Sequence, residues 1–171
     1  MLKRWILITL AAGGALAAFA ATSAGSQSGA IHIYEASVKG PGAPGTVVIT
    51  GAINDGGAGS ATGGITGPGK VVLSKGSIKD VATATLISRE QDLYGRALRA
   101  PACALVGTIT GPVKIVGGTG AYAGITGTVN ATYTVAAVLP KLKNGACNTA
   151  HHTRPIGVAI FIKASGNVTV K

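Results

Sequence analysis

Residues 128–138, TVNATYTVAAV, alternate strictly between polar and apolar side chains. The apolar positions are Val129, Ala131, Tyr133, Val135 and Ala137. Successive side chains of a β-strand point to opposite faces, so this period places all five on one face and leaves Thr and Asn on the other. The pattern predicts a half-buried strand.

Short strands joined by tight turns account for most of the remaining chain. Glycine is 27 of 171 residues, and Thr and Val are abundant, which favours many short strands. We predict further strands at residues 31–37, 46–53, 70–74, 81–88, 104–109, 112–116, 156–164 and 167–170. Such a set forms a sandwich or a closed barrel, and closure removes the edges through which strands rich in Val and Thr aggregate. The expected fold is all-β: a single closed or nearly closed antiparallel β-barrel of about eight strands, after a cleaved signal peptide.

The N-terminus has the pattern of a secretory signal peptide. Lys3 and Arg4 precede the uncharged residues 5–21, and small residues lead to a cleavage position after Ala24. The alternative is a membrane-spanning helix, for which the apolar stretch is at the lower length limit. We therefore expect residues 1–24 to be removed and residues 25–171 to form one secreted β-barrel domain, in which no later stretch is apolar for long enough to span a bilayer.

Two segments without alternation, residues 87–103 and 140–155, are expected at the same rim of the barrel, the first as a long loop with a helical turn. Each contains one of the two cysteines, Cys103 and Cys147. An even number of cysteines in an exported chain predicts a disulfide, and closing so long a loop stabilises the fold by roughly 4 kcal/mol in the chain-entropy model. The alternative, a nucleophilic cysteine, requires a free thiol beside a base.

The net charge of +10 suits an anionic partner such as a cell-wall polymer, a phospholipid surface or nucleic acid. Nucleic acid is disfavoured because the chain has few aromatic residues and no Arg-rich run. A soluble basic surface without a specific partner is the simpler interpretation. Candidates for an anion-binding rim are Arg96, Arg99, Lys141, Lys143 and Arg154.

Two glycine-rich stretches imitate nucleotide-binding motifs. Residues 118–123 have the spacing G-x-G-x-x-A, but the following residues alternate as a strand and no acidic residue occurs after Asp92, so the helix and the ribose-binding carboxylate are both missing. Residues 64–71 have P-loop spacing, but Val71 replaces the Ser or Thr that would bind magnesium. We expect no nucleotide or other cofactor, and we interpret the first motif as a tight turn that depends on Gly117, Gly118, Gly120 and Gly124.

No catalytic or metal-binding set is evident. There is no G-x-S-x-G motif, and the acids available to a hydrolase are Glu35, Asp55, Asp80, Glu90 and Asp92. The adjacent His151 and His152 would point apart on an extended chain, and no H-x-H spacing is present. His32 and Glu35 alternate across the first predicted strand, so one of them is a candidate polar residue of the barrel lumen.

The stretch VGGTGAYAGITG, residues 116–127, resembles the strand–turn–strand signature of the dirigent protein and allene oxide cyclase superfamily. It is also similar to uncharacterised secreted bacterial proteins in which a GGTGxYxG turn precedes a long alternating strand, a Cys-Asn pair and a Pro, here Cys147, Asn148 and Pro155. The resemblance covers residues 104–170. It implies an antiparallel barrel that shapes a ligand inside it, while neither family's catalytic residues can be placed on this sequence.

Three function classes follow. The favoured one is a secreted, non-catalytic structural or ligand-binding barrel, which either holds a small apolar ligand or acts at the cell surface. The second is an isomerase- or cyclase-type enzyme that uses the lumen and needs a buried acid beside a cavity, which Glu35 or Asp80 would supply. The third binds anionic cell-surface polymers through the basic rim. Whether the lumen is packed or hollow distinguishes these function classes. Tyr122 and Tyr133 are expected to define the turn and the core rather than a ligand site.

Overall fold

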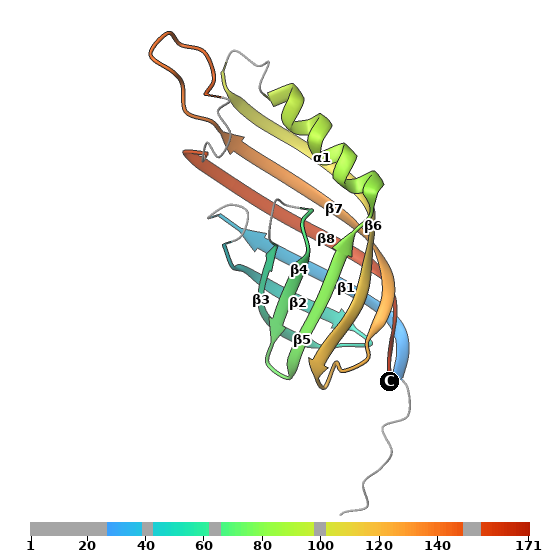
Figure 1. Cartoon of the computed structure of the whole chain (residues 1–171). Coiled ribbons are helices and arrows are strands. Elements are labelled where there is room, and N and C mark those ends of the chain that lie inside the picture. Colours follow the sequence, from blue (N-terminus) through green and yellow to red (C-terminus); the bar gives the residue numbers. More distant parts are fainter. Residues whose placement is uncertain (1–26, 39–42, 62–65, 98–101, 149–154) are drawn as a thin grey trace, which may run out of the picture.

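Eight antiparallel strands close into a barrel, with one helix beside it, in the computed structural model of residues 27–38, 43–61, 66–97, 102–148 and 155–171 (Figure 1). The predicted signal peptide, residues 1–24, lies outside the described residues. The elements are β1 (Gln27–Ser37), β2 (Gly45–Gly51), β3 (Asp55–Ala61), β4 (Gly69–Leu73), β5 (Gly76–Ala82), α1 (Ala84–Ala97), β6 (Ala104–Gly120), β7 (Thr126–Val138) and β8 (Gly157–Val170).

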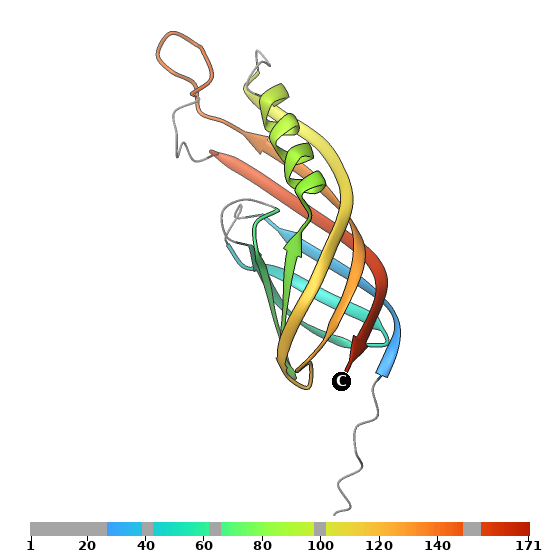
Figure 2. The same ribbon diagram turned by 45° about the vertical axis from the view of Figure 1, so that its right-hand side comes forward.

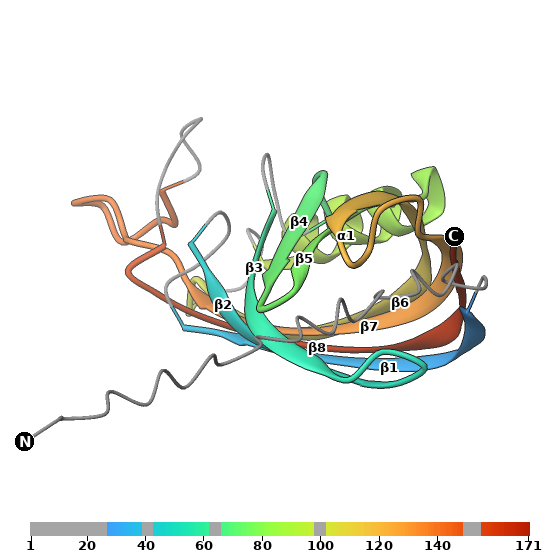
Figure 3. The same cartoon turned by 90° about the horizontal axis from the view of Figure 1, so that it is seen from below.

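Each strand pairs with the next one in sequence, and β1 pairs with β8 from Gln27↔Val170 to Ser37↔Ile160. The predicted closed antiparallel barrel is confirmed. Viewed from below, β6, β7, β8 and β1 form one continuous wall (Figure 3). The lumen-facing side chains make the core, and they include the five alternating apolar residues of β7, all of which are buried.

Two observed strands each join two of the predicted ones. β6 runs through both predicted strands at 104–109 and 112–116, and β8 runs through those at 156–164 and 167–170. Proline is tolerated in β6 because pairing with β5 stops at Ala82↔Val113, next to Pro112, so β6 has only β7 as a strand neighbour beyond that point.

The predicted strand at 81–88 is wrong, because β5 ends at Ala82 and α1 begins at Ala84. The backbone N–H groups of Leu86 and Ile87 donate to the carbonyl of Thr83, which starts the helix. The helix is therefore four turns long rather than a loop with one turn. Leu86 and Leu93 are buried and lie seven residues apart on one helix face, which is a helical period. The β-branched residues around Leu86 hide this period in the sequence.

Helix α1 covers β6 where β5 no longer does, and it lies along β6 in the rotated view (Figure 2). Cβ atoms placed at Gly107 and Gly111 would contact Leu93 and Leu86. These two glycines alternate in register with buried Leu105, Ile109 and Val113, so the helix packs on the face of β6 that points into the lumen further along.

The sequence gives no sign of β3, whose residues DGGAGSA lack an apolar alternation. β3 nevertheless pairs with both β2 and β4. At Gly57 a Cβ atom would overlap the carbonyl of Val72 on β4. Small side chains let neighbouring strands approach here, which is why the strand carries little hydrophobic signal.

The G-x-G-x-x-A segment forms the hairpin between β6 and β7, as expected. The φ angle of Gly120 is 62°, and a Cβ atom there would meet the backbone of Lys75 and Gly76. Gly117 and Gly124 also have positive φ, whereas at Gly118 a Cβ atom would overlap two backbone carbonyl oxygens. The motif is followed by a strand rather than a helix, so the pyrophosphate-binding geometry of a dinucleotide fold is absent from this hairpin.

The predicted disulfide joins Cys103 to Cys147, 44 residues apart, with a Cα–Cα distance of 5.3 Å. It links the segment after α1 to the loop between β7 and β8. Within that loop, Lys141 pairs with Cys147 as an isolated bridge and Gly145 N–H donates to the carbonyl of Leu142. The C-terminal end of α1 and this loop lie at the same end of the molecule in Figures 1 and 2, as predicted for the two segments.

Candidate functional site

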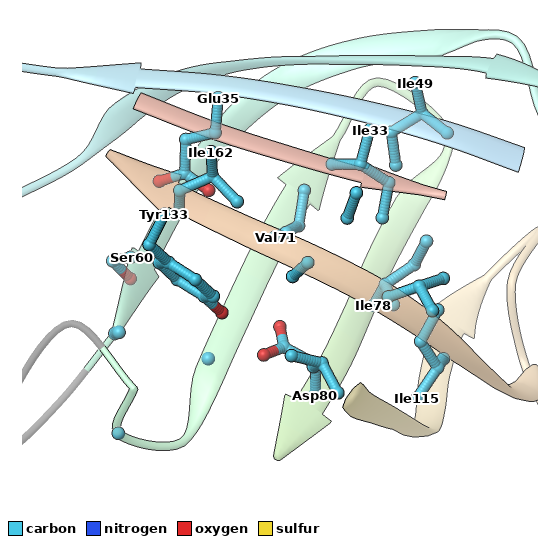
Figure 4. Close-up of a pocket in the computed structure, with 17 residues that line it drawn as sticks. Ile33, Glu35, Ile49, Ser60, Val71, Ile78, Asp80, Ile115, Tyr133 and Ile162 are labelled. Atoms are coloured by element: carbon cyan, nitrogen blue, oxygen red, sulfur yellow. The ribbon is translucent and has the colours of Figure 1, made fainter. Parts of the chain in front are cut away.

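The lumen is hollow near one end. A cavity of ≈ 70 Å³ lies between the strands, several times the roughly 10–15 Å³ that one water molecule requires on a comparable measure. Its walls are mainly apolar, and its polar side chains are those of Glu35, Ser60, Asp80 and Tyr133. The apolar lining includes Ile33, Ile49, Val71, Ile78, Ile115 and Ile162 (Figure 4).

Of the two lumen candidates on β1, Glu35 faces the cavity and His32 is exposed. The carboxyl group of Glu35 fits against two glycines on neighbouring strands. A Cβ atom at Gly59 would lie 2.6 Å from Oε2 of Glu35, and one at Gly45 would lie 2.9 Å from Oε1. The glycines of β2 and β3 therefore provide the space that the Glu35 carboxyl group occupies.

Asp80 enters the cavity from β5, two residues before that strand ends. β5 pairs with β6 through an irregularity, since Lys79 pairs with Gly117 but Asp80 pairs with Ile115. On its other side Asp80 pairs with Gly69, where a Cβ atom would overlap the Asp80 carboxyl group. Asp80 thus repeats the arrangement of Glu35, a carboxyl group seated against a glycine of the adjacent strand.

Both carboxyl groups are hard to ionise. Burial, and then the charge of Asp80, raises the pKa of Glu35 to about 7. Burial raises the pKa of Asp80 to about 6. Within the described part of the chain, neither group receives a hydrogen bond, and no Lys, Arg or His lines the cavity. At neutral pH Glu35 is therefore divided between its protonated and ionised forms.

Tyr133 is the third titratable group of the cavity. Its side chain is only 6% exposed, which confirms the predicted core face of β7. Burial, followed by the charges of Asp80, Glu35 and Glu90, raises its pKa above the ordinary range. Its hydroxyl group makes no hydrogen bond with any described residue and faces the cavity (Figure 4). Tyr133 therefore belongs to the core, as predicted, and the same side chain also lines the cavity.

The cavity has a closed apolar end and a more accessible polar end. Ile49, Ile78 and Ile115 are buried, whereas Glu35, Ser60 and Asp80 are partly exposed. The polar side chains of Glu35, Ser60 and Asp80 lie where β1, β3 and β5 approach their last residues. A protonated carboxyl group can donate a hydrogen bond or a proton to a molecule in the cavity, and an ionised one can accept.

Helix α1 fixes one border of this polar end. Glu90 is 8% exposed and accepts hydrogen bonds from the backbone N–H of Thr66, at 3.1 Å, and from the Thr66 hydroxyl group. Thr66 immediately precedes Gly67, which lines the cavity. The helix therefore holds the chain that enters β4 in place.

The basic rim is described in part. Arg96, Lys141 and Lys143 are exposed, on α1 and on the adjacent loop. Arg99 and Arg154 lie outside the described residues, as do His151 and His152. In the described part of the chain, no three His, Cys, Asp or Glu side chains are grouped as a metal ion would require. The helix that the structure describes is not long and apolar enough to cross a membrane.

No protein family, curated protein or solved structure matches this chain. The resemblance of residues 116–127 to the dirigent and allene oxide cyclase barrels therefore stays a prediction from the motif, as do the signal peptide and secretion.

Proposed function

We propose that this protein is a secreted barrel that binds a small, mainly apolar molecule in its lumen. The hollow lumen carries the proposal: aliphatic side chains line the cavity, while Glu35, Asp80 and Tyr133 supply polar atoms at its accessible end. An apolar pocket with a few convergent polar groups is the usual form of a small-molecule site. The two carboxyl groups also meet the requirement stated above for a lumen enzyme, but nothing in the cavity specifies a reaction.

The test is occupation of the cavity by small probes. We expect benzene and 1-propanol, titrated separately, to shift the NMR methyl signals of Ile49, Ile78 and Ile115 at the closed end. Replacing Ala131, which lines the cavity on β7, with Leu should abolish these shifts by filling the space. Ala136→Leu is the matched control, because Ala136 lies on the opposite face of the same strand. Probes that fail to shift the wild-type signals would overturn the proposal.

A second candidate function, binding of an anionic cell-surface polymer, is favoured by the distribution of charge. All five acidic residues are described, and Asp92 is the only one that is exposed. Glu35 and Asp80 line the cavity, Asp55 accepts hydrogen bonds at the turns, and Glu90 is buried. The exposed basic residues in the described part are Lys70, Lys75, Lys79, Arg89, Arg96, Lys114, Lys141, Lys143, Lys163 and Lys171. Among the described residues, every exposed charged side chain except that of Asp92 is therefore basic.

Dextran sulfate tests this candidate. Binding should weaken steeply with added salt, and a Lys141→Ala/Lys143→Ala variant should bind less tightly than a Lys75→Ala/Lys171→Ala variant, which loses the same charge at the other end of the barrel. Equal losses in the two variants would mean that the basic rim has no special role.

A further inference from the structure

The lumen contains acids without a cationic partner among the described residues. The titratable side chains that line it are Glu35 on β1, Asp80 on β5 and Tyr133 on β7. The lysines of β4, β5, β6 and β8 are exposed and do not line it, namely Lys70, Lys79, Lys114 and Lys163. Glu90 of α1 adds a further negative charge that acts on Tyr133. Two carboxyl groups of a basic protein thus lie in a largely apolar cavity that no described Lys, Arg or His side chain lines.

Glycines at three positions make room for these acids. The carboxyl group of Glu35 lies against Gly45 and Gly59, and that of Asp80 lies against Gly69. Each carboxyl group therefore occupies space that is free only because the neighbouring residue is a glycine. Burying a carboxylate without a partner is nevertheless unfavourable. Packing alone does not explain why these two positions are acidic, since an apolar side chain would fill the lumen at a lower cost in free energy.

Tyr133 supplies a further polar group to the cavity. It is 94% buried, its hydroxyl group points into the cavity, and no described residue hydrogen-bonds to it. The buried polar atoms that lack a partner in the described part of the chain are Oγ of Ser37 and Oγ1 of Thr83, and the Tyr133 hydroxyl oxygen is not one of them. The hydroxyl oxygen and the two carboxyl groups therefore present three acceptors to the same space (Figure 4).

We propose that the lumen binds a small primary alkylammonium ion, whose charged nitrogen lies among Glu35, Asp80 and Tyr133 and whose alkyl group lies against the isoleucines of the closed end. An ammonium group has three N–H donors, which matches three acceptor groups, and its charge offsets those of the carboxylates. A neutral alcohol offers one donor and no charge. This inference rests on the proposed lumen function and specifies the chemical class of its ligand.

Binding of such a cation is linked to ionisation of the acids. The ammonium ion favours the carboxylate forms, so occupation lowers the raised pKa values of Glu35 and Asp80 and releases protons. Since Asp80 has a pKa of about 6, its ionised fraction rises about tenfold between pH 5 and pH 8. The affinity for the ammonium ion should rise by about that factor or more across this range.

The experiment compares propylammonium with 1-propanol and propionate, which have the same chain length but differ in charge. Each is titrated into the full-length protein at pH 5 and pH 8, and the methyl signals of Ile78 and Ile115 and the carboxyl signals of Glu35 and Asp80 are followed by NMR. We expect propylammonium to bind at least about tenfold more tightly than 1-propanol at pH 8. Propionate should bind more weakly than either.

Glu35→Gln and Asp80→Asn should each weaken propylammonium binding by at least about tenfold, and they should leave 1-propanol binding nearly unchanged. Asp92→Asn is the control, because it removes the exposed acid of α1. If a lumen variant fails to fold, the shift of the wild-type carboxyl pKa values on saturation with propylammonium decides instead.

The possible failures are distinguishable. If none of the three probes shifts the lumen signals, the proposed lumen function itself is wrong. If 1-propanol binds as tightly as propylammonium and affinity does not change with pH, the lumen is a binding site but not for a cation. If Asp92→Asn weakens propylammonium binding as much as the lumen variants do, the effect is one of overall charge, and the inference is overturned.

Discussion

The Tyr122 hydroxyl group donates a hydrogen bond of 2.5 Å to Oδ2 of Asp55, 67 residues earlier in the chain. The same carboxylate accepts hydrogen bonds from the Ser74 hydroxyl group and from the backbone N–H groups of Gly56, Ser74 and Lys75. Asp55 therefore joins three turns, those of the β2–β3, β4–β5 and β6–β7 hairpins, at one end of the barrel (Figure 1).

Removing the hydroxyl groups of Tyr122 and Tyr133 should have opposite effects. Tyr122→Phe takes one donor from Asp55, so we expect the melting temperature to fall by several degrees. Tyr133→Phe removes a hydroxyl group that faces the cavity and that no described residue hydrogen-bonds to, so it should leave the melting temperature unchanged or raise it. Tyr133→Ala, which leaves a cavity, should cost about 3 kcal/mol. A Tyr133→Phe variant less stable than Tyr122→Phe would contradict this assignment.

Asp55 should contribute to acid sensitivity. Hydrogen bonds from Ser74 and then Tyr122 hold the pKa of Asp55 well below its usual range. A carboxyl group whose folded pKa is lowered stabilises the fold above its unfolded pKa, and this stabilisation is lost as the pH falls through the folded value. We expect the urea midpoint to decrease as the pH is lowered below about 4, with a shallower decrease in Asp55→Asn. If the urea midpoint falls equally with pH in the wild type and in Asp55→Asn, other acidic residues determine the acid sensitivity.

Glu35 and Asp80 should have the reverse pH dependence. Their folded pKa values, about 7 and about 6, lie above the ordinary values, so the folded state binds more protons than the unfolded state between pH 4 and pH 7. Stability should therefore fall as the pH rises across this window. Thermal melts at pH 5 and pH 8 measure the effect, and it should be smaller in Glu35→Gln and Asp80→Asn, which cannot ionise.

The turn glycines should matter in the absence of any ligand. Gly120→Ala forces a Cβ atom into a left-handed backbone position, and we expect a loss of roughly 1 kcal/mol or more. Gly95→Ala on α1 is the control: a Cβ atom there meets nothing within 4 Å, so the fold should tolerate or gain from it. NAD, FAD and ATP at millimolar concentration should leave the melting temperature unchanged. A dose-dependent shift that Gly120→Ala abolishes without loss of stability would restore the nucleotide interpretation.

Loss of the disulfide should loosen one end of the molecule. We expect Cys103→Ala/Cys147→Ala to lower the free energy of unfolding by roughly 4 kcal/mol. Far-UV circular dichroism should still show the barrel, because all eight strand pairings lie outside the bond. Thiol titration of the denatured, unreduced wild-type protein should detect no free thiol. Two reactive thiols per chain would contradict the assignment.

Strand positions were predictable where the lumen side chains are large. β7 shows its buried face directly through Val129, Tyr133 and Val135. β3 does not, because glycines replace the apolar side chains where strands approach closely or where Glu35 needs room. The start of helix α1 resembles a strand in the sequence because Val81 and Ile87 continue a strand-like composition across it. Leu86 and Leu93 show the helical period only over a longer window.

The polar residues of the candidate site could be predicted from the sequence, but the cavity that they share could not. Glu35 was identified as a lumen candidate from its alternation with His32, and Asp80 was named as an acid that an enzyme would need. The sequence could not show that the two face one cavity, since Asp80 depends on the pairing of β5 with β6 and on the space at Gly69. The cavity itself depends on how the lumen side chains of different strands fit together, which no local pattern encodes.

The pairing of β1 with β8 also constrains the order of folding. The other strand pairs join neighbours in sequence, whereas Ile31 must find Gly166 and Ala36 must find Phe161. During synthesis β1 therefore keeps one unpaired edge until β8 has emerged, and the loop entropy of this contact must be overcome before its hydrogen bonds form. Closure should be the slow step of folding, and the interval before it is when the chain is most exposed to edge-to-edge aggregation.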